Sequence, residues 1–426
     1  MARQMKDSGI EWIGEIPEDW GIHTASQLFT QVKNKNEGMQ EDNLLSLSYG
    51  KIIKKSINTT EGLLPESFEG YNIIEPNDIV LRLTDLQNDH TSLRVGLSEQ
   101  RGIITSAYLT LRNESDCFER YLYYQLHAFD ICKGFYGMGA GVRQGLNWDG
   151  IKMLKIVRPT VAEQQRIAAF LDRKCAEIDA VIERTKATIE EYKKLKQAVI
   201  TEAVTKGVRG PRPMKDSGIK WIGEIPEGWD SAKLGGVTLA MRNGYVGPTR
   251  DLFFETGIRY IQSLHIKDGV IDFDRHPYYV AEEWANEHPK VHTNDILIVQ
   301  TGDIGQVGIV EPEYDGCNCH ALIIATPDCA LLSPRYLMLY LMSTPGKELL
   351  LSYKTGALLP HLNAGKIKFT PVLLPAMDEQ NEIVFYLDEK CAALDTLIAK
   401  KTALLTELET YKKSLIYEYV TGKKEV

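Results

Sequence analysis

The residues with the clearest potential for chemistry are three neighbours in the second half of the chain. Cys317, Cys319 and His320 form a C-x-C-H cluster, and thiolates and imidazoles are ligands that zinc prefers. A structural zinc site usually needs four ligands in paired short spacings, and the sequence has no second pair of this kind. Coincidence therefore explains the cluster better than a metal site does, and the sequence predicts no metal ligands.

A glycine-rich segment is the second candidate for chemistry. Gly137, Gly139 and Gly141 form a G-x-G-x-G pattern that could hold a nucleotide or S-adenosylmethionine. Such a loop should follow a strand and open a helix, whereas this one follows the helical pattern of 121–132 and precedes a strand-like segment at 151–157. We expect a flexible loop near a binding surface. Walker A, H-E-x-x-H, G-x-S-x-G and H-R-D patterns are absent from the sequence, which predicts no catalytic residue and no cofactor bound by this chain.

Basic, amide and aromatic side chains occur in the segments that are typical of loops. Lysine and arginine suit phosphates, and arginine and glutamine suit the edges of bases in a DNA groove. Each such residue taken alone is more often a solvated surface group. The candidates for contact with nucleic acid are Lys33, Lys35, Lys51, Lys54, Lys55, Arg101, Arg143 and Gln144 in the first half, and Arg242, Tyr245, Arg250, Gln262, Gln300, Lys354 and His361 in the second.

Length and composition limit the classes of protein to consider. A chain of 426 residues exceeds what one hydrophobic core usually supports, so two or more domains are expected. No apolar run approaches the roughly 20 residues of a membrane helix, and acids and a proline near the start argue against a secretory signal, which favours the cytoplasm. Seven scattered cysteines predict reduced thiols. The net charge of −9 gives no strongly basic clamp for DNA, but it permits local reading of bases with partners supplying phosphate attraction.

The chain consists of one unit written twice. Residues 5–20 and 214–229 are identical at 14 of 16 positions, and residues 163–182 and 379–398 at 10 of 20. The centres at 21–145 and 230–361 share little. Duplication followed by drift is one explanation. A duplicated scaffold that carries two different recognition surfaces explains better why the ends match and the centres do not.

A heptad pattern of apolar residues follows each copy of the second repeat and predicts two long helices with one apolar seam each. Pro159 and Pro375 precede these helices, and Gly207 and Gly422 follow them. Lys196 and Lys412 interrupt the seams at matching positions, where polar residues fix register. The helices could pair with another chain, but we favour pairing with each other. The predicted seam residues are Leu171, Ile178, Ile182, Ile189, Tyr192, Val199, Leu387, Leu394, Ile398, Leu405, Leu408 and Leu415.

The expected fold class is α+β, with two pseudo-symmetric mixed α/β domains separated by an antiparallel pair of long coiled-coil helices. Short runs such as 78–83, 103–111, 295–300 and 320–325 are typical of strands, whereas 119–136 and 334–344 are typical of helices. The predicted domain limits are 1–158 for the first recognition domain, 159–208 for the central helix, 209–375 for the second recognition domain and 376–426 for the C-terminal helix.

These repeated segments resemble the specificity (S) subunit of type I restriction-modification systems. The W-I-G-E-I-P-x-x-W segments, Trp12 to Trp20 and Trp221 to Trp229, look like the start of that family's target-recognition domains. A second run looks like its entry into the spacer helices, and consists of Leu146, Asn147, Pro159, Glu163, Gln164, Ile167, Leu171 and Asp172, repeated as Leu362, Asn363, Pro375, Glu379, Gln380, Ile383, Leu387 and Asp388. The resemblance covers the whole chain. The second copy departs from the first where Gln165-Arg166 becomes Asn381-Glu382, which puts in doubt whether both helices present the same surface to a partner.

The resemblance implies a non-catalytic protein that binds double-stranded DNA. Each domain would read one part of a split target, and the helix pair would set the gap between the parts. Two methyltransferase (M) subunits and the restriction (R) subunits would assemble on this scaffold and carry S-adenosylmethionine, ATP and Mg. The family supplies no universal base-reading motif, so the contact residues above rest on residue types alone.

Two other functions remain open on the sequence. A free-standing DNA-binding regulator would use the two domains for recognition and the helices only as a spacer. An enzyme in its own right would need cofactor-dependent turnover by the purified chain.

Overall fold

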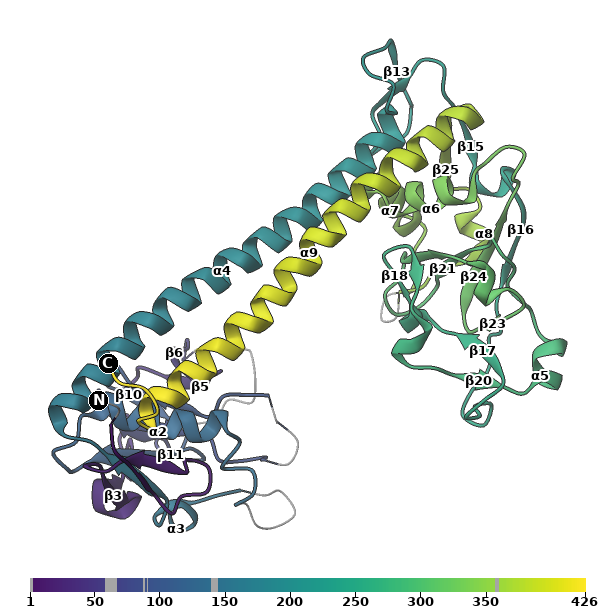
Figure 1. The fold of residues 1–426 in the computed structure, drawn as a ribbon. Coiled ribbons are helices and arrows are strands. Elements are labelled where there is room, and N and C mark those ends of the chain that lie inside the picture. The colour runs from purple at the N-terminus through teal and green to yellow at the C-terminus, as the bar shows by residue number, and fades with distance from the viewer. Residues whose placement is uncertain (1–2, 58–66, 87–88, 90, 139–144, 357–359) are drawn as a thin grey trace. The chain divides into compact units, whose positions relative to one another are not determined.

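Figure 1 shows a computed structural model of the chain, which describes residues 3–57, 67–86, 89, 91–138, 145–356 and 360–426. The chain forms two compact units. Unit 1 contains residues 1–186 and 403–426, and unit 2 contains residues 187–402. Each unit holds one mixed α/β domain together with a part of each of two long helices. The predicted fold class, two related α/β domains and an antiparallel pair of long helices, is confirmed.

The two long helices are continuous because their sequences contain no proline or glycine. Helix α4 spans Val161–Lys206 and helix α9 spans Met377–Val420. Each starts shortly after a proline and is followed by a glycine in the left-handed region, Gly207 at φ 76° and Gly422 at φ 72°. Glycine adopts this conformation without steric cost, so it ends a helix readily.

Each domain is built on a four-stranded antiparallel sheet with the same strand order. In unit 1 the order is β4 (Phe29–Gln31), β11 (Leu109–Asn113), β8 (Ile79–Leu81) and β9 (Val95–Leu97). In unit 2 it is β16 (Thr238–Asn243), β24 (Leu322–Pro327), β21 (Ile296–Val299) and β22 (Val307–Ile309). Ile79 pairs with Leu111 as Ile296 pairs with Ala325, so the two central strand pairs share one register.

The remaining elements surround these sheets. In unit 1 they are β1 (Met5–Asp7), β2 (Glu15–Pro17), β3 (Gly21–Thr24), α1 (Ala25–Leu28), β5 (Leu45–Ser48), β6 (Lys51–Lys54), β7 (Asn72–Ile74), β10 (Gly102–Ile104), α2 (Glu119–Ile131), α3 (Trp148–Ile151) and β12 (Lys155–Arg158). In unit 2 they are β13 (Met214–Asp216), β14 (Glu224–Pro226), β15 (Asp230–Lys233), β17 (Ile258–Ile261), β18 (Ile266–Lys267), β19 (Val270–Ile271), β20 (Tyr279–Val280), α5 (Glu282–Glu287), β23 (Asn318–Cys319), α6 (Pro334–Met342), α7 (Thr344–Leu351), α8 (Ala364–Ile367) and β25 (Pro371–Leu374), with single 3-10 turns at Leu234–Gly236, Ser263–His265, Phe273–Arg275 and Pro312–Tyr314.

Several element boundaries differ from the sequence prediction, and three of the differences have a local cause. The run 103–111 forms two strands, β10 and β11, because a turn closed by the hydrogen bond from Tyr108 N to Thr105 O interrupts it. The segment 151–157 is a strand only from Lys155, because Asn147 caps the short helix α3 by accepting a hydrogen bond from Gly150 N. The helix predicted for 119–136 ends at Ile131.

The repeated sequence segments join each domain to the start of a long helix. Trp20 Nε1 donates to Glu163 at 3.2 Å, and Trp229 Nε1 donates to Glu379 at 3.0 Å. Both indoles are almost completely buried. The next residue in each helix repeats the pattern, because the side chains of Gln164 and Gln380 each accept from a backbone N–H of the domain at 2.8 Å. We call the repeated segments at the two ends of each copy the frame. These bonds join the domain to its long helix, which gives a physical reason why the two copies share the frame.

Candidate nucleic-acid interface

Helices α4 and α9 pack against each other in both units through the predicted seam. Of the twelve seam residues, seven are buried and five are partly exposed. The buried seven are Leu171, Ile178, Ile182, Ile189, Leu387, Leu394 and Leu415, and the partly exposed five are Tyr192, Val199, Ile398, Leu405 and Leu408. In unit 1, Ile178 and Ile182 belong to one apolar cluster with Leu405 and Leu408.

Two equivalent ion pairs fix the register of the helix pair. Asp179 binds Lys412 at 2.6 Å in unit 1, and Lys196 binds Asp395 at 2.7 Å in unit 2. Adding 216 to one pair gives the other, since 179 becomes 395 and 196 becomes 412. The lysines that interrupt the seams therefore each have an aspartate on the facing helix. Moving along the helix pair, residue numbers rise in α4 and fall in α9, since Asp179 faces Lys412 and Lys196 faces Asp395. The two helices are therefore antiparallel.

The sequence difference between the starts of α4 and α9 is explained in part by an ion pair near the start of α9. Glu382 replaces Arg166 and binds Arg209 of the linker at 2.7 Å, while Asp378 binds the same guanidinium at 2.7 Å. Arg166 is exposed. The two helix starts thus carry different charges at equivalent positions.

The two sheets are equivalent at the end where β8 stops in unit 1 and β21 stops in unit 2. We call this end of each sheet the loop end. The carbonyl of Leu83 accepts from Leu146 N at 2.9 Å, and the carbonyl of Gln300 accepts from Leu362 N at 2.9 Å. Leu146 and Leu362 are equivalent residues of the repeated frame. Leu83 and Gln300 therefore occupy the same scaffold position, and the segments around them can be compared directly.

In unit 1 the loop end is held together by a buried arginine. Arg94 is 0% exposed, and its guanidinium donates to the carbonyls of Arg82 at 3.0 Å and Thr84 at 2.9 Å. Its Nε donates to Tyr136 Oη at 3.1 Å, and its backbone N–H donates to Asp130 at 2.6 Å. Burial raises the pKa of Asp130 to about 6. Arg94 is not among the residues that the sequence predicts for this end, because a single arginine beside a polar loop has no distinctive spacing.

In unit 2 the loop end gathers several of the predicted contact residues. Gln300 follows β21, and Thr301 forms a β-bridge with His361. Gln262 follows β17, whose last residue Ile261 accepts a hydrogen bond from His320 N at 2.8 Å, just before β24 begins. Tyr245 O accepts from Ala321 N at 2.9 Å beside the same strand start.

Most polar groups described at this end are hydrogen-bonded, and one buried acceptor is the exception. His361 Nε2 lies 3.1 Å from Thr355 Oγ1, and Lys354 next to it is exposed. Gln262 N donates to His265 Nδ1 at 2.9 Å. Gln300 Oε1 is buried and has no hydrogen-bond partner among the residues that the structure describes.

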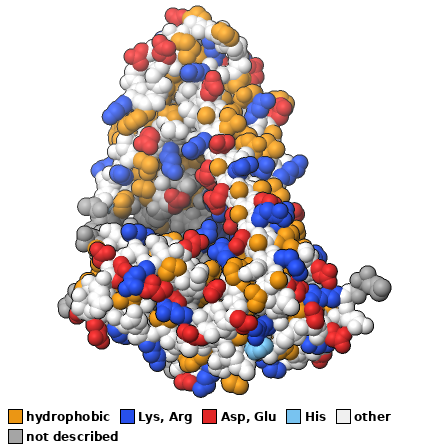
Figure 2. All heavy atoms as spheres, turned by 90° about the vertical axis from the view of Figure 1, so that its left-hand side faces the viewer, with side chains coloured by type: hydrophobic (Ala, Val, Ile, Leu, Met, Phe, Trp, Pro, Cys, Tyr) orange, Lys and Arg blue, Asp and Glu red, His pale blue; other side chains and the backbone are white. Residues whose placement is uncertain are grey.

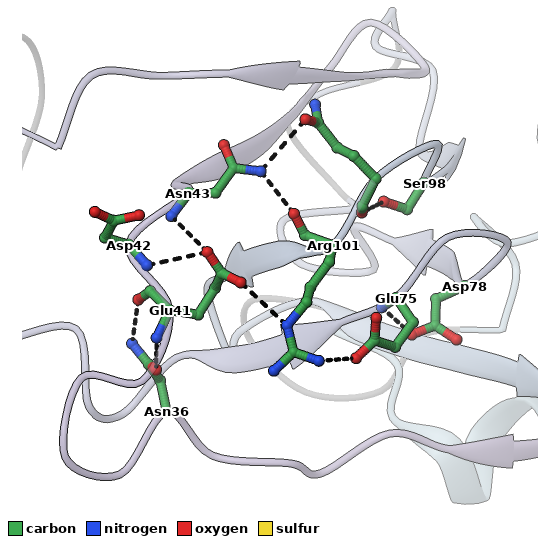
Figure 3. Close-up of polar contacts among 9 residues, drawn as sticks. Asn36, Glu41, Asp42, Asn43, Glu75, Asp78, Ser98 and Arg101 are labelled. Carbon is green, nitrogen blue, oxygen red and sulfur yellow. Dashed lines mark hydrogen bonds and ion pairs between the residues drawn. The ribbon is translucent and has the colours of Figure 1, made fainter.

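Two predicted contact residues are already paired within their own domains. Arg101 lies between Glu41 and Glu75 and forms an ion pair with each, as Figure 3 shows. Arg242 binds Asp295 at 3.3 Å and donates to Thr326 Oγ1 at 3.1 Å. These contacts give both arginines a role in holding the fold, and their contact with nucleic acid stays a prediction.

The other predicted contact residues differ in their surroundings. Lys33, Lys51, Lys54, Lys55 and Arg250 are exposed. Lys35 Nζ donates to Gly70 O at 2.8 Å. Arg143 and Gln144 lie outside the described residues, as do Gly139 and Gly141 of the glycine segment. On the face that Figure 2 shows, basic and acidic side chains are interspersed.

The two cysteines of the predicted cysteine and histidine cluster belong to the hydrophobic core of the second domain. Cys317 and Cys319 are buried, and burial raises their thiol pKa values to about 11 and about 12. His320 Nδ1 lies 3.2 Å from Tyr260 Oη. Within the described part of the chain, no group of three or more histidine, cysteine, aspartate or glutamate side chains is placed to hold a metal ion.

Comparison with known proteins points to one family. The family model described as the type I restriction modification DNA specificity domain matches residues 226–409. The chain is 24% identical to the type I restriction enzyme MjaVIII specificity subunit of Methanocaldococcus jannaschii, over 96% of this chain and 94% of that subunit. The chain is therefore similar to the type I restriction specificity subunits over nearly its whole length.

Two further comparisons bear on this family. The type I restriction enzyme EcoBI specificity subunit of Escherichia coli is 28% identical over 276 residues, which are 62% of this chain and 57% of that subunit, so the match spans less than two-thirds of its length. A chain in a solved structure on complex assembly and conformational transition of the type I restriction-modification system has a TM-score of 0.71 at 16% identity, over 96% of this chain and 99% of that chain. That structure shows that the fold is shared. No helix among the described residues is long and apolar enough to cross a bilayer.

Proposed function

We propose that this chain is the DNA sequence-recognition subunit of a type I restriction-modification complex, in which each domain reads one part of a split target. The observation that carries the proposal is the repeated frame with unlike loop ends. The same strand order, the same hydrogen bond at Leu83 or Gln300 and the same buried tryptophan occur in both units, while the segments beside them differ. A shared frame with different loops suits two surfaces that read different sequences.

The helix pair sets the gap between the two parts of the target. Helix α4 has 46 residues and is therefore about 69 Å long at about 1.5 Å per residue. B-DNA rises about 3.4 Å per base pair, so the length of the helix pair limits how many base pairs can separate the two parts of the target. The paired lysines and aspartates of the seam oppose a shift of one helix along the other.

Two copies of a methyltransferase partner dock on equivalent places of the helix pair. Val181 and Tyr411 flank the ion pair of unit 1 in sequence and are 42% and 55% exposed. Leu195 and Leu397 flank the ion pair of unit 2 and are 49% and 41% exposed. The four residues are related by the same offset of 216, so each unit offers one exposed apolar pair. Exposed apolar side chains off the seam suit a protein partner.

The chain itself performs no catalysis in this proposal. The M subunits supply S-adenosylmethionine and adenine methylation, the R subunits supply ATP- and Mg-dependent cleavage, and the complex works in the cytoplasm. The net charge of −9 fits this division, because the M and R subunits then provide much of the attraction to DNA phosphates.

Insertion of one heptad into both helices tests the proposal. Seven residues after Ile189 and seven after Leu405 keep the seam in phase and lengthen each helix by about 10 Å. The complex with its M subunits should methylate a split motif with the same two half-sites and a longer gap, read by sequencing of methylated adenines. Changed half-sites with the wild-type gap would contradict the spacer role.

The alternative is a free-standing DNA-binding regulator with two recognition domains. Gel shifts of the isolated chain separate the two functions, because tight and sequence-specific binding without M subunits favours the regulator. Failure to bind any methyltransferase chain on co-expression would overturn the proposed function.

A further inference from the structure

Gln300 occupies a scaffold position at which the other domain has a core leucine. Leu83 is 1% exposed and packs in the main core cluster of its domain. Gln300 is partly exposed, and its Oε1 is buried without a hydrogen-bond partner among the described residues. An unpaired buried acceptor lowers stability, and Leu83 shows that the frame accepts an apolar side chain here. Packing alone therefore does not explain a glutamine at this position.

The surroundings of Gln300 are those of a polar reading surface. Thr301 and Thr355 each form a β-bridge with His361, and Leu362 N donates to Gln300 O at 2.9 Å, so the segment around His361 lies beside the backbone of Gln300. Gly302 is exposed and has φ 86°, and a side chain built on it would lie 4.0 Å from Ser263 Oγ. Hydroxyl, imidazole and amide groups therefore line one end of the sheet, where a groove of DNA can approach the backbone closely.

We propose that Gln300 is a specificity-determining residue that reads an adenine in the half-site of the second domain, an inference that rests on the proposed function. A glutamine carboxamide accepts from adenine N6 and donates to adenine N7 in the major groove. Since the side chain is partly exposed, a change of rotamer brings Oε1 to the surface, where the base supplies the donor that the free chain lacks. The first domain has Leu83 at this position and reads its half-site with other residues.

Two substitutions in the complex with its M subunits test the role of the amide. Gln300→Leu copies the first domain, so we expect it to fold with an unchanged or higher Tm and to lose discrimination at one base pair of one half-site, by about tenfold to a hundredfold. Gln300→Glu should instead favour cytosine at that base pair, because a carboxylate accepts from cytosine N4. The other half-site and the gap should stay as in the wild type, as read by sequencing of methylated adenines.

A second glutamine of the same turn is the matched control. Gln306 Nε2 donates to Asp303 at 3.0 Å, so Gln306→Leu changes the turn without touching the unpaired acceptor. We expect this variant to keep the wild-type motif. The inference is wrong if Gln300→Leu and Gln300→Glu both methylate the wild-type motif, or if Gln306→Leu relaxes the same base pair. A wild-type complex that methylates no split motif would overturn the proposed function as well, which separates the two failures.

Discussion

The two domains hold equivalent ends of equivalent sheets by different means. In unit 1 the described residues between β8 and β9 supply carbonyl acceptors, those of Arg82 and Thr84 among them, to the guanidinium of the fully buried Arg94. In unit 2 the segment between β21 and β22 is shorter and turns at Gly302 and Gly305, with φ values of 86° and 81°. The carbonyl groups of a long segment need a hydrogen-bond donor inside the domain. A tight glycine turn leaves few carbonyl groups without a donor.

The hairpins over the two sheets repeat the comparison. The hairpin β5–β6 turns at Tyr49-Gly50 and β18–β19 turns at Asp268-Gly269, all at positive φ. They lie over equivalent glycines of the sheets, since a side chain on Gly96 would meet Leu47 and one on Gly308 would meet Ile266. The backbone is thus conserved between the copies, while the exposed side chains differ, with lysines at 51, 54 and 55 in unit 1. The duplication kept the geometry and changed the surface.

Among substitutions that should affect one domain and not the other, the largest effect is expected at Arg94. Arg94→Met leaves several buried carbonyls without a donor, and we expect it to lower the free energy of unfolding of unit 1 by about 3 to 5 kcal/mol. The half-site read by the first domain should be lost while the second is kept, as measured by urea unfolding and by sequencing of methylated adenines in the complex.

Arg82→Met is the matched control for Arg94. Arg82 belongs to the same segment but is partly exposed and lies 3.8 Å from Asp89, so the variant should cost less than about 1 kcal/mol. Equal loss for the two variants, or equal weakening of both half-sites, would show that Arg94 does not hold the loop end of one domain alone.

The next effect concerns a buried histidine that only unit 1 has at its position. His127 of α2 corresponds to Met342 of α6, since Arg120 and Arg335 bind the equivalent aspartates Asp172 and Asp388. Burial, and to a smaller extent Lys412, lowers the pKa of His127 to about 4. Because the unfolded chain takes up this proton near pH 6.5, stability is complete above that pH and falls as the pH drops toward 4, by about 3 kcal/mol.

His127→Met copies the residue of unit 2 and should remove the loss of stability that His127 causes at low pH. The difference in the free energy of unfolding between the variant and the wild type should shift in favour of the variant by about 3 kcal/mol from pH 7 to pH 4, measured by urea unfolding. Asp130, whose raised pKa acts in the opposite direction, is present in both proteins and cancels in the difference. A difference that does not change with pH would mean that His127 has the same pKa in the folded and in the unfolded chain.

The sequence predicts the frame better than the candidate interface, for a physical reason. Heptad spacing and the doubled segments are local or exact repeats, so the helices and their seam are visible without a structure. The partners of Arg101 and Arg242 are not, because Glu75 and Asp295 lie 26 and 53 residues away. The type of Gln300 made it a candidate, but its unpaired oxygen and its equivalence with Leu83 depend on how the strands pair.

The smallest expected effect tests whether the helix pair is the same in both units although the domains differ. Lys412→Met removes the ion pair with Asp179, and Lys196→Met removes the pair with Asp395. The side chains are 20% to 54% exposed, so each substitution should cost about 1 kcal/mol or less, and the loss should shrink at high salt. Double-mutant cycles with Asp179→Asn and Asp395→Asn measure the two coupling energies, which should agree within about 0.5 kcal/mol. A coupling energy present in one unit and absent in the other would mean that the domains, and not the seam alone, determine how tightly the helices pair.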